Sequence, residues 1–123
     1  MQTDTRVAVD QIGDEGGRPV TVLRFAGDIS STSREALLGT YQNLAKAEHP
    51  RILLDFTKVE YLNSSGIALV IQMLLEASRS EQTIRIFGLT PHFQKVFTMV
   101  GITRYTNLYP DEATAVASFS SAA

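Results

Sequence analysis

The order of the apolar segments predicts an α/β domain with a mixed, mostly parallel sheet, an N-terminal antiparallel hairpin and about four helices. Two strand-like segments come first, at 7–12 and 19–25, with a glycine-rich turn between them. After them, segments with apolar residues at helical spacing alternate with short apolar segments. Such alternation is typical of parallel strands joined by helical crossovers. The chain of 123 residues, without a repeat or a linker, is expected to form one domain, 1–123, with a core at about 7–119.

In the first half of the chain, the second strand is expected to turn Val20, Val22 and Leu23 inward. A capping-box pattern at Thr32 and Glu35 predicts the start of the first helix, with Thr32 as its N-cap. The apolar residues that would form its buried face are Leu37, Leu38, Tyr41, Leu44 and Ala45. Pro50 prevents its continuation, and the apolar run 51–56 is typical of a strand covered on both faces.

In the second half, a largely buried helix is expected from Ser64 to about Ser80, followed by a strand at 83–87. Thr90 as N-cap and Pro91 at the first helical position predict a third helix that Gly101 ends. Its inner stripe would be formed by Phe93, Val96, Phe97 and Val100. A last short strand is expected at 104–109. A final helix is expected from 110 with Val116 and Phe119 inward, and with a frayed end beyond them.

Composition narrows the class of function. The net charge of −2 and the pI near 5.6 argue against nucleic-acid binding, which usually requires a basic face. The chain has no cysteine, and therefore no disulfide framework or thiolate metal site. The N-terminal residues lack the apolar core of a signal peptide, and no apolar run is long enough to span a bilayer. A cytoplasmic protein without membrane insertion is the expectation.

Two consecutive serines, Ser64 and Ser65, stand where a strand and a short loop lead into the apolar second helix. A serine at a helix start is a common N-cap, and Gly66 would serve only to bring the helix close to the sheet. The alternative is functional, because one N-cap needs only one hydroxyl and α/β folds usually bind ligands at this end of their strands. A phosphate on either hydroxyl would then lie at the positive end of the helix dipole.

The segment 55–67 resembles the signature of STAS domains, specifically of the stand-alone anti-sigma factor antagonists. Its central part is Asn63-Ser64-Ser65-Gly66, preceded by Asp55-Phe56-Thr57. The segments 25–29 and 87–102 resemble the family's turn after the second strand and its fourth strand with the third helix. The likeness therefore covers nearly the whole chain.

The resemblance implies a partner-switching regulator in signal transduction and transcription regulation. We expect no enzyme activity, no cofactor and no metal. The partners of this regulator would be an anti-sigma factor with serine kinase activity and a metal-dependent serine phosphatase. The phosphorylated residue would be Ser65, with Ser64 as the alternative. The contact residues that the resemblance implies are Asp28, Ser30, Ser31, Asn63, Ser64, Ser65 and Gly66. Asn63 and Ser30 stand where the family commonly has carboxylates. A kinase and a phosphatase that recognise those carboxylates would therefore meet different groups in this chain.

Three alternatives stay open at this stage. The first is a permanently bound STAS subunit of a stressosome-like or lipid-transporter complex, in which the serines serve packing only. The second is a small serine hydrolase, although the serine motif lacks the nucleophile-elbow pattern and both histidines, His49 and His92, are expected on the surface. The third is a metal site at Asp10, Asp14 and Glu15, which a solvated acidic loop explains equally well.

Overall fold

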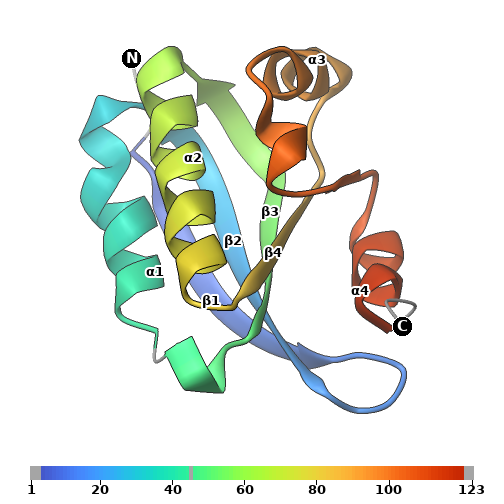
Figure 1. Cartoon of the computed structure of the whole chain (residues 1–123). Helices are drawn as coiled ribbons and strands as arrows, with labels where there is room; N and C mark the ends of the chain where they lie inside the picture. The colour runs from blue at the N-terminus through green and yellow to red at the C-terminus, as the bar shows by residue number, and fades with distance from the viewer. Residues whose placement is uncertain (1–3, 45, 121–123) are drawn as a thin grey trace.

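The computed structural model describes residues 4–44 and 46–120. Five strands form one mixed sheet in the order β1-β2-β3-β4-β5 (Figure 1). The strands are β1 (Arg6–Gly13), β2 (Pro19–Ile29), β3 (Arg51–Leu62), β4 (Thr83–Phe87) and β5 (Leu108–Tyr109). β1 and β2 are antiparallel, and every other neighbouring pair is parallel. The predicted class, hairpin and mostly parallel sheet are confirmed.

The helices cover the two faces of the sheet unequally. The helical elements are η1 (Ser31–Ser33), η2 (Glu35–Gly39), α1 (Thr40–Gln42), η3 (Lys46–Glu48), α2 (Ser64–Arg79), α3 (Pro91–Met99), η4 (Ile102–Arg104) and α4 (Glu112–Ser120). The first three form one continuous helical segment, with a 3₁₀ start and a π-helical middle. This segment, α2 and α3 pack on one face, and α4 covers part of the other (Figure 1).

The larger core lies between the sheet and the helices η2 to α3. β3 runs through its middle, and residues 52–56 of that strand are all buried. The rings of Phe25, Phe56 and Phe97 form a continuous contact from β2 to α3, with centroids 5.4 and 5.8 Å apart. The smaller core lies under α4 and comprises Val20, Val22, Leu53, Phe87, Ala115 and Phe119. Side chains on both faces of β3 are therefore buried, as the apolar run predicts.

The structure corrects three details of the predicted elements. The N-cap of the first helical segment is Ser30, not Thr32: Ser30 accepts a hydrogen bond from the Thr32 amide, and Ser33 completes a capping box. The last strand, β5, has only two residues, because the chain before it forms the short helix η4. Val100 is 49% exposed, since it ends α3 and points away from the core.

The second helix is less buried than predicted, since Leu75 of α2 is exposed and Ile71 is half-buried. Several other predicted details of the helices are confirmed. Leu37, Leu38 and Tyr41 are buried and Leu44 packs against the core, whereas Ala45 lies outside the described residues. Thr90 caps α3, and Gly101 follows it in the left-handed conformation, with φ of +83°. The C-terminal end that is predicted to fray includes residues 121–123, which also lie outside the described residues. Within the described part of the chain, no helix is long and apolar enough to cross a membrane.

Of the acidic residues near the hairpin, Asp14 has a structural role, whereas Asp10 and Glu15 are exposed. Asp14 has a fully buried carboxylate, which pairs with Arg51 at 2.6 Å and with Arg18 at 3.2 Å. The bond from Arg51, more than any other contact, lowers the pKa of Asp14 well below its ordinary value. Among the described residues, no group of three or more side chains is arranged to hold a metal ion.

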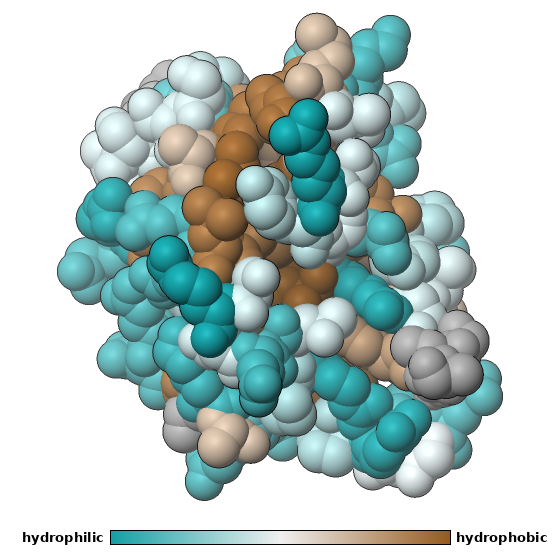
Figure 2. All heavy atoms as spheres, in the orientation of Figure 1, coloured by the Kyte–Doolittle hydropathy of each residue, from teal (hydrophilic) through white to brown (hydrophobic). Residues whose placement is uncertain are grey.

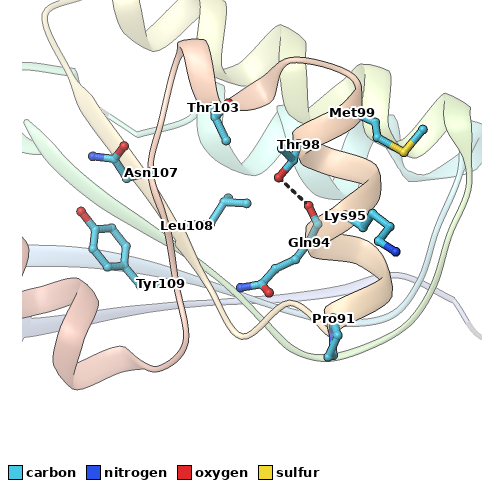
Figure 3. A pocket seen from close by; sticks show the side chains of 9 residues that line it. All are labelled: Pro91, Gln94, Lys95, Thr98, Met99, Thr103, Asn107, Leu108 and Tyr109. Atoms are coloured by element: carbon cyan, nitrogen blue, oxygen red, sulfur yellow. Dashed lines mark hydrogen bonds between the residues drawn. The ribbon is translucent and has the colours of Figure 1, made fainter.

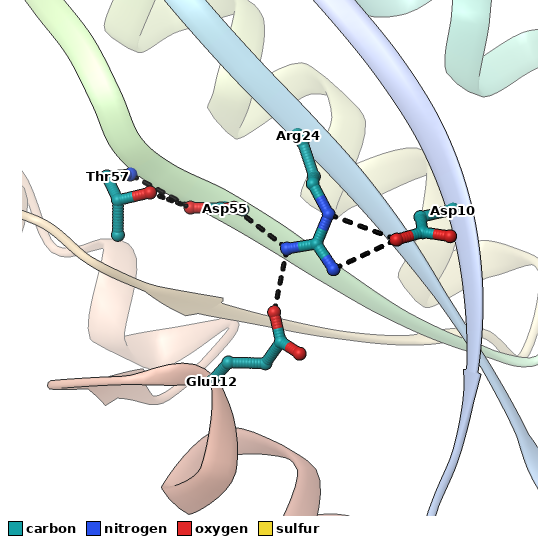
Figure 4. Close-up of polar contacts among 5 residues, drawn as sticks. All are labelled: Asp10, Arg24, Asp55, Thr57 and Glu112. Atoms are coloured by element: carbon teal, nitrogen blue, oxygen red, sulfur yellow. Dashed lines mark hydrogen bonds and ion pairs between the residues drawn. The ribbon is translucent and has the colours of Figure 1, made fainter.

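On the face that α4 covers, Arg24 joins three carboxylates from three elements (Figure 4). It pairs with Glu112 of α4 at 2.7 Å, with Asp55 at 3.0 Å and with Asp10 at 3.1 Å. The bond to Glu112 is the main reason that the pKa of Arg24 is raised, so Arg24 stays charged. Asp55 also accepts hydrogen bonds from the amide and hydroxyl of Thr57. This network holds the start of α4 against the middle of the sheet.

Candidate functional site

The two segments with the predicted contact residues meet at the carboxyl ends of β2 and β3. In the parallel register, Asp28 lies opposite Tyr61 and Ile29 opposite Leu62. The Asn63 amide then donates a hydrogen bond of 3.2 Å to the Ile29 carbonyl, which extends the pairing past the end of β3. Residues 28–33 and 63–66 therefore form one surface, which we name the contact loops. All seven residues that the resemblance implies lie in them.

Asn63, rather than a serine, caps helix α2. Its backbone is extended, with φ of −104° and ψ of 179°, and its side-chain oxygen accepts a hydrogen bond of 2.9 Å from the Gly66 amide. Its carbonyl accepts the first helical bond, from Ile67. This is the geometry of an N-cap. The sequence-based interpretation of Ser64 or Ser65 as the N-cap is therefore wrong.

Gly66 sets the distance between the two contact loops. A Cβ atom at this position would lie 2.4 Å from the Ile29 carbonyl oxygen and 2.8 Å from its side chain. Real Cβ atoms do not come that close to backbone, so only glycine allows α2 to begin here. The close approach that the sequence suggests for Gly66 is confirmed, and it joins the start of α2 rigidly to the end of β2.

Ser64 and Ser65 are both exposed, at the first two positions of α2. Within the described part of the chain, neither hydroxyl has a hydrogen-bond partner. Helical geometry turns the two side chains about 100° apart around the axis. The first turn contains no acidic residue, so the positive end of the helix dipole is not offset there. Two exposed hydroxyls thus stand on a rigid turn whose cap is supplied by another residue.

The other contact loop is held by hydroxyl groups that the sequence analysis did not single out. The buried Ser33 hydroxyl accepts a hydrogen bond of 2.9 Å from the Ser30 amide and donates to the Asp28 carbonyl. Thr5, just before β1, also bonds to Ser33 and to the Asp28 carbonyl. Because Thr5 lies more than twenty residues away in sequence, no local pattern predicts this contact. Ser30 serves the loop as a buried cap, and Ser31 is exposed.

The two histidines do not form a catalytic arrangement with the serines. His49 is half-buried, not a plain surface residue, and its Nδ1 lies 2.7 Å from the Thr21 hydroxyl. Thr21 pairs with the start of β3, whereas Ser65 follows the end of that strand. His92 is exposed on the first turn of α3, where its ring lies 5.6 Å from that of Phe93.

A broad hollow lies away from the contact loops, between α3 and the segment that leads into β5 (Figure 3). Its lining is mixed: Pro91, Gln94, Lys95, Thr98, Met99, Thr103, Asn107, Leu108 and Tyr109. The Thr98 hydroxyl donates to the carbonyl of Gln94, 2.8 Å away, as the dashed line in Figure 3 shows. The hollow contains none of the predicted contact residues.

A family model described as "Mlab, STAS domain" matches residues 13–110. The chain belongs to the STAS domain family. A search among curated proteins finds no match. Solved structures do match this STAS domain, at sequence identities so low that they establish the fold alone.

Three of these structures show that the fold occurs in different kinds of protein. An anti-sigma factor antagonist from Mycobacterium paratuberculosis superposes with a TM-score of 0.78 at 18% identity, covering 96% of this chain and 97% of that one. The phosphorylated form of Bacillus SpoIIAA gives a TM-score of 0.68 at 18% identity, covering 92% and 98%. The murine anion transporter Slc26a9 gives 0.75 at 8% identity, covering 99% of this STAS domain but 23% of the transporter.

Proposed function

We propose that this STAS domain is an anti-sigma factor antagonist, which binds an anti-sigma factor through the contact loops and is switched by phosphorylation of Ser65. The observation that carries the proposal is the capping of α2 by Asn63, which leaves the Ser65 hydroxyl exposed and without a structural task. The likeness to a structure named as an anti-sigma factor antagonist and to one of Bacillus SpoIIAA in a phosphorylated form supports it. Ser64 is the alternative site.

The switch follows from electrostatics. A phosphoserine carries about −1.5 to −2 charges. On the free domain it would be exposed at the positive end of α2, so the fold tolerates it. A partner that lies flat over the contact loops would instead have to bury this charge, which costs several kcal/mol when it is unpaired. Since about 1.4 kcal/mol is a tenfold change in affinity, one phosphate would lower partner affinity by orders of magnitude.

The kinase would be the anti-sigma factor itself, and a metal-dependent phosphatase would reverse the modification in the cytoplasm. The carboxylates that the family commonly has near this serine are replaced by Asn63 and Ser30. In this chain both have structural tasks as caps of α2 and η1. Asp28, half-buried in the same loop, is the acidic residue that remains for recognition by the kinase and the phosphatase.

The test is intact-mass and peptide mapping of the protein isolated from its native cell, with and without phosphatase treatment. We expect one phosphate on the peptide that contains Ser64 and Ser65. The matched variants Ser65→Ala and Ser64→Ala assign it, because only the first should abolish the modification. An unmodified chain under every growth and stress condition would contradict the switch.

The second candidate is a permanently bound STAS subunit of a larger complex. Two observations favour it: the family model carries the name Mlab, and the same fold makes up 23% of a transporter chain. The discriminating experiment is purification of the chain with its native partners under phosphatase treatment and under phosphatase inhibition. A switched antagonist loses its partner in the second case, whereas a permanent subunit keeps it in both.

A further inference from the structure

The outward face of α2 carries an apolar stripe that continues from the serines. Ala68 and Leu75 are exposed, Leu75 by 37%, and Ile71 between them is half-buried. With Ser64, these residues have the spacing i, i+4, i+7 and i+11, so they lie along one line of the helix. Figure 2 shows an apolar band on this side of the molecule, beside α2.

The core does not require the two exposed residues of this stripe, Ala68 and Leu75, whereas the half-buried Ile71 also packs against it. A separate set of α2 side chains already packs against the sheet: Ile67, Leu69, Val70, Met73, Leu74 and Ala77. Polar residues at 68 and 75 would therefore keep the helix in place. Exposed apolar residues in a continuous line, next to a polar border, mark surfaces that bind another molecule.

Two arginines border the stripe. Arg34 reaches toward α2, where its guanidinium lies 3.5 Å from the Gln72 side chain. Arg79 lies one turn beyond Leu75 on the same line of α2. In the described part of the chain, neither guanidinium makes an ion pair, whereas Arg18, Arg24 and Arg51 are all paired. The nearby Glu76 is held toward α1 by Gln42 at 3.1 Å.

We propose that this face binds an amphipathic helix of a protein partner, with an apolar stripe flanked by acidic residues. The inference rests on the proposed function, since it extends the partner surface from the contact loops along the whole of α2. Apolar side chains of the partner would pack over Ala68, Ile71 and Leu75. Its carboxylates would pair with Arg34 and Arg79, which a basic or neutral helix would leave unpaired.

The test uses two synthetic helical peptides of about 18 residues. Both carry leucines at i, i+4, i+7 and i+11; one has glutamates beside the stripe and the other has lysines. Binding to the isotope-labelled full chain is followed by amide chemical shifts. We expect the acidic peptide to bind about tenfold or more tightly than the basic one, with shifts along α2. Binding should weaken as salt is added. Equal affinities, or shifts elsewhere, would overturn the proposal.

Matched variants locate the surface. Leu75→Glu and Arg79→Glu should each weaken binding of the acidic peptide several-fold, whereas Val9→Glu, at a residue that is 48% exposed on β1, should not. Concentration-dependent dimerisation in sedimentation, or binding to anionic vesicles that Leu75→Glu abolishes, would assign the face to another occupant and overturn the proposal. Neither peptide result depends on Ser65, so the phosphate mapping tests the proposed function independently of this surface.

Discussion

At the start of β3, charged side chains are paired with one another, whereas just beyond its end two serine side chains are exposed and make no hydrogen bond in the described part of the chain. Arg51, the first residue of the strand, pairs with the buried Asp14 carboxylate, which Arg18 also contacts. Beyond the last residue, Ser64 and Ser65 have no protein partner among the described residues. Polar groups thus have two different roles at the two ends of this strand. Groups that stabilise the fold are bonded internally, and groups that are left to solvent are available for another molecule.

The largest effect on stability is expected beyond the end of β3, from Gly66→Ala. The added Cβ would lie 2.4 Å from the Ile29 carbonyl, so α2 must shift away from β2. Overpacking of this kind costs about 1–3 kcal/mol. Chemical denaturation measures the loss. Gly39→Ala, in the first helical segment, is the control, because its Cβ would meet only the end of the flexible Glu35 side chain. Equal stability of both variants would contradict the close approach.

At the start of β3, the expected effect depends on pH. Hydrogen bonds, first of all from Arg51, hold the pKa of Asp14 below its ordinary value of 3.8. A carboxyl group whose pKa is lower in the folded state stabilises the fold above its unfolded pKa, and this contribution is lost as the pH falls. The wild-type protein should therefore lose stability below about pH 4–5, and Asp14→Asn should lose less over the same range. Thermal unfolding followed by circular dichroism from pH 7 to low pH checks this. Parallel curves for the two proteins would disprove it.

A smaller effect is expected from Asn63→Ala, which removes the N-cap of α2. Loss of such a cap costs about 0.5–2 kcal/mol. Asn63→Asp keeps an acceptor for the Gly66 amide and should retain the stability of the wild type. Comparison of the two variants by chemical denaturation separates the loss of the cap from any change at this position. If Asn63→Ala were as stable as the wild type, a serine would be the better candidate for the cap.

The smallest effect is expected from the serines. Ser64→Ala and Ser65→Ala remove hydroxyls that bind nothing in the described chain, so each should change stability by less than about 0.5 kcal/mol. Their effect should appear only in modification and partner binding. A loss near that of Asn63→Ala would show that a serine hydroxyl supports the fold, and the contrast between the two ends of β3 would then fail.

The sequence predicts the sheet and the position of α2 because these depend on patterns within a few residues of each other, whereas the residues of the contact loops come from the family resemblance. It misassigns the cap of α2 because Asn63, Ser64 and Ser65 are all good N-caps, and only the backbone conformation at Asn63 decides among them. The same ambiguity moves the first cap from Thr32 to Ser30.

Contacts between distant segments account for the rest. The bonds of Thr5 to the Asp28–Ser33 loop, and the pairing of Asp14 with Arg51, join residues that only the completed sheet brings together. The shortness of β5 has a similar cause. The aromatic and β-branched residues at 105–109 suit a strand, but the turn at Gly101 and η4 precede the point where the chain reaches the sheet edge, so only two residues pair there.

Capping by Asn63 also has an evolutionary consequence. Because the cap lies one residue before the serine pair, positions 64 and 65 can accept many side chains without loss of the helix. A domain with a modifiable hydroxyl and a domain without one can thus differ by a single codon. Under the proposed function, descendants of one ancestral chain would gain or lose regulation in one mutational step, while the proposed partner surface is inherited unchanged.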